Sequence, residues 1–93
     1  MAGPHPLVPV GGPLRGAALA ALCTQVRQLV ASGSQVVSLD LLAVPHAELG
    51  TVEALARLQL VASRAGGRIR VCSGQAELRE LLALAGLDWL LED

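Results

Sequence analysis

The side chains best suited to chemistry gather around one short stretch, VPHAELGTVEAL, which runs from Val44 to Leu55. Asp40 and Glu48 are carboxylates that together could hold a metal ion, but no further ligand stands near them. A hydrogen bond that orders the loop is therefore the favoured role of Asp40. His46 lies close to Glu48, yet no Ser or Cys nucleophile has a recognisable spacing to it. The stretch predicts neither a catalytic site nor a metal site, and His46 is interpreted as a solvated loop residue.

A glycine-rich segment and two cysteines offer other chemistry. VGGPLRG precedes a helical pattern, as in phosphate-binding loops, but it lacks the G-x-G-x-x-G spacing and the Walker Lys-Ser/Thr pair. Its glycines are predicted to be turn residues, and a small nucleotide-binding module is kept as an alternative function. Cys23 and Cys72 fall in apolar segments, where a free Cys behaves as a small buried hydrophobe. No cofactor is predicted.

Composition limits the class of protein. The 93 residues suit one domain; 53% are hydrophobic and Trp89 is the single aromatic residue, so Leu, Ala and Val must fill the core. A net charge of −1 gives no reason to expect nucleic acid or an acidic membrane as partner. The N-terminus lacks a signal-peptide pattern, and no run of about 18 apolar residues occurs. We expect a cytoplasmic protein without direct membrane insertion, with flexible residues 1–6 before a single domain over residues 7–93.

Strand and helix patterns alternate along the chain. Pro9 interrupts a short apolar run, which makes it an edge strand at best. Gly86 and Leu87 are placed as a glycine C-cap and the hydrophobic residue that follows it. The predicted strands span residues 7–10, 36–41 and 68–72; the predicted helices span residues 15–31, 51–65 and 76–85. This order predicts an α/β fold with a small, largely parallel sheet, in which 36–41 and 68–72 are adjacent, and about three helices packed on it.

Two segments carry a family resemblance. VVSLDL, a loop and a glycine that opens a helix, followed by ASRAGGRIRVCSGQAELRELLALAGLDWLL, resemble a STAS domain. That family includes bacterial anti-sigma-factor antagonists and a small cytoplasmic subunit of phospholipid-transporting ABC systems. The resemblance implies a non-catalytic protein-interaction domain, whose partner is an anti-sigma factor, a related kinase or an ABC ATPase subunit. It also places Asp40 beside the loop that carries the family's phosphoacceptor.

The phosphoacceptor itself is missing. Many STAS domains carry Asp-Ser-Ser-Gly or Asp-Ser-Thr-Gly in this loop, and a partner kinase phosphorylates the first Ser. Aligning Gly50 with the motif's glycine puts Ala47 at the Asp position, Glu48 at the acceptor and Leu49 at the second hydroxyl. Glu48 either imitates the phosphorylated state incompletely or only supplies a favourable charge near a helix start. Thr51 is an alternative acceptor or an ordinary helix-start residue.

The helix after this loop carries two apolar stripes at about 100° per residue. One stripe, predicted to face the sheet, comprises Leu55, Leu58, Val61 and Ala62; the other comprises Leu49, Val52, Ala56 and Leu60. A helix on a small sheet needs only one stripe. The second is therefore either packed within the domain or exposed for a partner, and partner docking is favoured, with Glu53 and Arg57 beside it. The same face predicts a weak homodimer when the partner is absent.

Overall fold

The computed structural model describes residues 6–44 and 48–91, apart from the side chain of Ser73. Strands β1 (Leu7–Pro9), β2 (Val36–Asp40) and β3 (Arg68–Ser73) form one sheet in the order β1-β2-β3, and both pairs are parallel. The predictions that residues 36–41 and 68–72 form adjacent parallel strands, and that the first strand lies at an edge, are confirmed.

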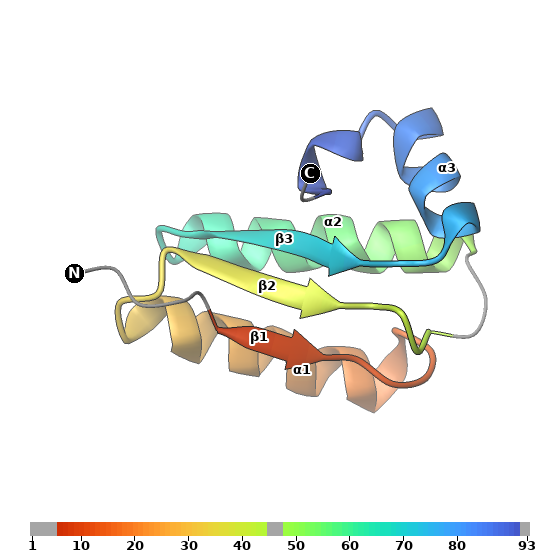
Figure 1. The fold of residues 1–93 in the computed structure, drawn as a ribbon. Coiled ribbons are helices and arrows are strands. Elements are labelled where there is room, and N and C mark those ends of the chain that lie inside the picture. The colour runs from red at the N-terminus through yellow and green to blue at the C-terminus, as the bar shows by residue number, and fades with distance from the viewer. Residues whose placement is uncertain (1–5, 45–47, 92–93) are drawn as a thin grey trace.

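Helices join the strands in sequence. They are α1 (Gly16–Ala31), α2 (Leu49–Arg64) and α3 (Ala76–Leu84), followed by a 3₁₀ turn, η1 (Asp88–Leu90). α1 and α2 connect successive strands in the same direction across the sheet, so crossovers of one hand place both helices on the same face (Figure 1). α3 packs against α2, and η1 lies against β3. The predicted α/β fold with three helices is confirmed, and each helix begins and ends within two residues of its predicted position.

The core lies between the sheet and these helices. Register places Val8, Leu39 and Val71 in one row across the sheet, and all three are buried. Both α1 and α2 contribute apolar side chains to this core, and those of α2 belong to the stripe predicted to face the sheet. α1 supplies Leu22, Val26 and Val30; α2 supplies Leu55, Leu58 and Ala62. Trp89 is 56% exposed, so the described core contains no buried aromatic side chain and consists almost entirely of aliphatic side chains, as the composition predicts.

The opposite face of the sheet has a different character. Leu7, Ser38 and Arg70 form a second row by register, and side chains alternate between faces along a strand, so this row points away from the helices. No described helix covers this face (Figure 1). Cys23 is buried as predicted, whereas Cys72 is only half-buried, and its thiol donates to the carbonyl oxygen of Leu39 at 3.4 Å.

Both edges of the sheet offer little to an added strand. On β1, the N–H of Val10 and the carbonyl of Pro6 bond to β2, so Pro9 lies at the outward position, where it has no N–H to donate. On β3, the N–H of Ile69 donates to Gln59 Oε1 at 2.9 Å, and Val71 forms a parallel bridge with Leu91. Association with another protein is therefore expected to use side-chain surfaces rather than strand pairing.

Glycines end two of the helices. After α3, Gly86 has a φ of 74° and the N–H of Leu87 donates to the carbonyl of Leu82 at 2.7 Å, which confirms the predicted C-cap. After α2, Gly66 has a φ of 98°, and the N–H of Gly67 reaches back to Ala62 at 2.8 Å. The Gly66-Gly67 pair thus turns the chain from the end of α2 into the first residue of β3.

Candidate functional site

The loop between β2 and α2 is tied at its start by side chains. Asp40, the last residue of β2, accepts the N–H of Leu42 on Oδ1 at 3.0 Å, so the predicted loop-ordering hydrogen bond is present. Gln75, the N-cap residue of α3, donates from Nε2 to the carbonyl oxygens of Leu42 at 3.2 Å and Val44 at 3.4 Å. The sequence analysis missed Gln75, because nothing in its neighbourhood indicates a contact with so distant a loop.

The rest of that loop includes positions that the sequence analysis singled out. Pro45, His46 and Ala47 lie outside the described residues, so their predicted roles stay predictions. Glu48 is the N-cap residue of α2, with extended backbone at φ −130° and ψ 164°, and its exposed side chain makes no capping hydrogen bond. The carboxylate therefore acts on the helix start only through its charge. α2 begins at Leu49, two residues before its predicted start at Thr51.

The backbone conformation at Gly50 does not require a glycine. This residue lies inside α2 and its φ is not positive. A methyl group added at this position would meet no atom within 4 Å. The glycine that the sequence analysis aligned with the family motif is thus neither a turn residue nor a close-packing residue in the described structure.

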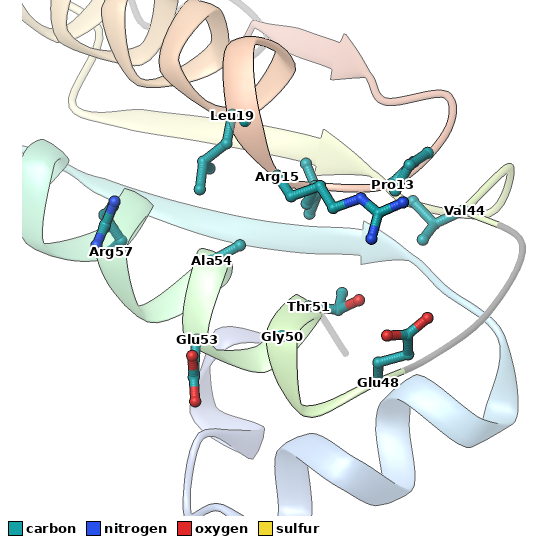
Figure 2. A pocket seen from close by; sticks show the side chains of 12 residues that line it. Pro13, Arg15, Leu19, Val44, Glu48, Gly50, Thr51, Glu53, Ala54 and Arg57 are labelled. Atoms are coloured by element: carbon teal, nitrogen blue, oxygen red, sulfur yellow. The ribbon is translucent and has the colours of Figure 1, made fainter.

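A pocket of about 430 Å³ opens between the first turns of α1 and α2 (Figure 2). Residues 13–16 and Leu19 line one side, Val44 closes one end, and α2 supplies the other side from Glu48 to Arg57. The pocket thus lies beyond the carboxyl ends of β1 and β2, where open α/β sheets place their binding sites. It joins Asp40's loop to the glycine-rich segment, although the sequence analysis treated the two as separate features.

Thr51 is the most deeply buried polar side chain in this pocket, with 7% of its surface exposed. Its N–H donates to the carbonyl of Glu48 at 3.0 Å, and its hydroxyl has no hydrogen-bond partner among the residues that the structure describes. Every fully enclosed side-chain polar atom in that part of the chain does have a partner, so the Thr51 hydroxyl must open to the pocket. Leaving a buried hydroxyl unbonded costs about 1–3 kcal/mol.

The second stripe of α2 is only partly exposed. Leu49 and Leu60 are 71% and 50% exposed, and Ala56 is exposed too, whereas Val52 is 7% exposed and belongs to the core. The inclusion of Val52 in the exposed stripe was therefore wrong. Val52 lies two helical turns before Gln59, whose side chain bonds to β3, so Val52 lies on the flank of α2 that faces β3.

What remains is a narrow exposed surface along α2, here named the α2 crest. It consists of Leu49, Glu53, Ala56, Arg57 and Leu60. Its two leucines are about 16 Å apart along the helix at 1.5 Å per residue. The crest runs beside the pocket, because Glu53 and Arg57 belong to both.

Comparison with known proteins gives the family. A family model described as "Mlab, STAS domain" matches residues 1–92. The chain belongs to the STAS domain family. Among solved structures, the chain is similar to the anti-sigma factor antagonist SpoIIAA in its unphosphorylated form, with a TM-score of 0.69 and 12% sequence identity over 94% of this chain and 76% of that one. No curated protein matches the STAS chain.

The structural likeness bears on the fold of this STAS domain, since the identity is low. It confirms the predicted STAS-like sheet with its three helices. Among the described residues, no helix is long and apolar enough to span a membrane. The same residues contain no group of three or more His, Cys, Asp or Glu side chains placed to hold a metal ion.

Proposed function

We propose that this STAS domain is a non-catalytic regulator of the anti-sigma-factor-antagonist type, which docks a protein partner through the 45–50 loop and the α2 crest. The carrying observation is the crest itself: Leu49 and Leu60 remain half or more exposed although a small core needs aliphatic side chains. The protected sheet edges support a helix-based contact. The fold shared with SpoIIAA, described as an anti-sigma factor antagonist, supports the class of partner. We place the protein in the cytoplasm.

We also propose that this domain is no longer regulated by phosphorylation of the loop before α2. Glu48 stands at the start of α2 with its carboxylate exposed, as the aligned acceptor would, and neither Glu48 nor Leu49 offers a hydroxyl. A permanent charge of −1 there imitates part of a phosphoserine, which carries a charge of about −1.5 to −2. The nearest hydroxyl on α2 is that of Thr51, whose 7% exposure protects it from a kinase.

We expect incubation with a cognate kinase and ATP to leave residues 48–51 unmodified, as measured by mass spectrometry of the digested protein. The variant Glu48→Ser, combined with Ala47→Asp, restores the motif and should gain phosphate on the new serine. Phosphate on Thr51 of the unaltered protein would contradict the loss of switching.

A second candidate is the cytoplasmic accessory subunit of a phospholipid-transporting ABC system, the other role that the family resemblance implies. The absence of hydroxyls at Glu48 and Leu49 favours it, because a contact that is never released needs no switch. Its partner would be the ATPase subunit, which would bind the same α2 crest. The identity of the captured protein separates the two roles.

The docking surface can be tested with charge substitutions on the crest. Leu60→Glu and Leu49→Glu each bury an unpaired carboxylate if the partner covers the crest, so we expect each to weaken partner binding by at least about tenfold. Leu84→Glu, on α3 and away from the crest, serves as the matched control, because Leu84 is 84% exposed. The measurements are capture from the native host, identification of the partner, and its affinity for each purified variant.

In the same samples, sedimentation without the partner tests whether the crest forms a weak homodimer that Leu60→Glu dissociates. Affinity that is equal in the crest variants and the control, with folding intact, would place the docking site elsewhere.

A further inference from the structure

The pocket between α1 and α2 contains a polar group that the protein itself does not satisfy. Thr51 is more than nine-tenths buried, its hydroxyl faces the cavity, and no described residue accepts or donates a hydrogen bond there. Figure 2 shows the Thr51 side chain projecting from α2 into the space between the two helices. A hydroxyl in this position can donate to a bound molecule and fix its orientation.

A free cation reaches the same end of the pocket. Arg15 is the N-cap residue of α1, and its side chain extends across the pocket toward the end lined by Thr51 and Val44 (Figure 2). Its guanidinium forms no ion pair with any described residue. Guanidinium groups bind the oxygens of phosphates and carboxylates through two parallel hydrogen bonds.

Two helix starts add to this positive character. Neither α1 nor α2 has a side-chain cap at its N-terminus, and Gly16 and Gly50, in their first turns, line the pocket. The first N–H groups of a helix have no partner within it and carry a partial positive charge. An oxygen-rich anion is the ligand that such groups bind.

One negative group opposes such a ligand. The Glu48 carboxylate lines the same end of the pocket, whereas Glu53 points away from it (Figure 2). The Glu48 side chain makes no hydrogen bond or ion pair with a described residue, so no described partner neutralises its charge. A bound anion must therefore overcome repulsion from Glu48, which lowers its affinity without blocking the cavity.

We propose that this pocket binds a phosphate monoester, whose phosphate group contacts the Thr51 hydroxyl, the Arg15 guanidinium and the N–H groups of the two helix starts. The volume of about 430 Å³ leaves room for an organic part beyond the phosphate, along the apolar side chains of Leu19 and Ala54. Repulsion from the Glu48 carboxylate lowers the affinity of the pocket for this ligand. This site goes beyond the docking function, because its ligand is a small molecule inside the pocket, whereas the proposed protein partner binds the neighbouring α2 crest, which shares Glu53 and Arg57 with the pocket lining.

The test is a titration of the isotope-labelled protein, followed by the amide signals of Gly16, Gly50 and Thr51. The ligands are glycerol 3-phosphate and inorganic phosphate, with sodium chloride at matched ionic strength. We expect saturable shifts of these three signals with both phosphates, tighter binding of the monoester, and no saturation with chloride. Absence of saturable shifts at these amides would overturn the site, and equal affinity for the two phosphates would overturn the role of the organic part.

Variants locate the contacts. Thr51→Val keeps the shape of the side chain, and we expect it and Arg15→Gln each to weaken binding by at least about fivefold. Glu48→Gln should tighten binding about threefold, because it removes the repulsion. Arg27→Gln, an exposed position of α1 that does not line the pocket, is the control for general charge effects. Thermal melting checks that each variant folds. Affinities in Thr51→Val and Arg15→Gln that equal the control's would contradict the proposed contacts.

Discussion

Gly67→Ala is expected to lower the free energy of unfolding by about 2–3 kcal/mol, near the upper end of the cost of forcing an extra carbon into a packed site. The added Cβ would lie 2.8 Å from the carbonyl oxygen of Gln35 and 2.9 Å from both methyl groups of Val30. Neither neighbour can yield easily. The Gln35 carbonyl accepts the N–H of Arg68 at 2.9 Å, and Val30 is buried in the core. Chemical denaturation followed by circular dichroism measures the loss.

Gly50→Ala is the matched control for Gly67→Ala. Gly50 also lies outside the left-handed backbone region, but its added Cβ would meet no atom within 4 Å. In a helix this change is neutral or stabilising, by up to about 1 kcal/mol. Both variants therefore add one methyl group, but Gly67→Ala should lower the free energy of unfolding, whereas Gly50→Ala should leave it unchanged or raise it. Equal effects in both would show that Gly67 does not make the close approach to Gln35 and Val30.

The two glycines before β3 show how far local pattern predicts a fold. Their place between a helix and a strand marks a turn from sequence alone, and the apolar runs on either side predict the elements correctly. The reasons differ between them, however. Gly66 is needed for a positive φ, which is a local property, whereas Gly67 is needed because two distant segments meet there. Only the packed structure reveals the second reason.

The candidate site likewise combines contacts that a local sequence pattern predicts with contacts between distant segments that it does not predict. The Asp40 hydrogen bond to Leu42 spans two residues, and short-range reasoning predicts it correctly. Gln59 and Gln75 bond to backbone groups 10 and 31 to 33 residues away, so no local pattern indicates them. The pocket likewise depends on which sides of α1 and α2 meet, because its lining comes from separate parts of the chain.

On α2, helical periodicity predicts only part of the burial pattern. It places each side chain at an angle around the helix, but it does not say which flank another element covers. Val52 and Leu60 fall on one predicted stripe, yet Val52 is 7% exposed and belongs to the core, whereas Leu60 is 50% exposed. The stripe therefore divides between core and surface, and substitutions on the same helix should separate the two.

Val52→Glu is expected to remove about 3–5 kcal/mol of folding free energy, whereas Leu60→Glu is expected to change it by no more than about 0.5 kcal/mol. Val52 is 7% exposed and belongs to the hydrophobic core cluster, so an ionised carboxylate there loses its hydration. At roughly 0.05–0.15 kcal/mol per residue, a domain of this length has about 5–14 kcal/mol in total. Val52→Glu should therefore remove a large share of the folding free energy.

Both variants introduce a glutamate on the same helix, so net charge changes equally in both, and the large expected difference between them reports the burial of each position. Denaturant midpoints measured by circular dichroism, at neutral pH and again at low pH, give the result. Protonation of the new carboxyl at low pH should restore part of the stability of Val52→Glu relative to the unaltered protein, because burial penalises only the charged form. Leu60→Glu should show no such recovery, since its carboxylate stays in water. A large loss in Leu60→Glu would place Leu60 in the core and remove the α2 crest, and with it the proposed docking surface.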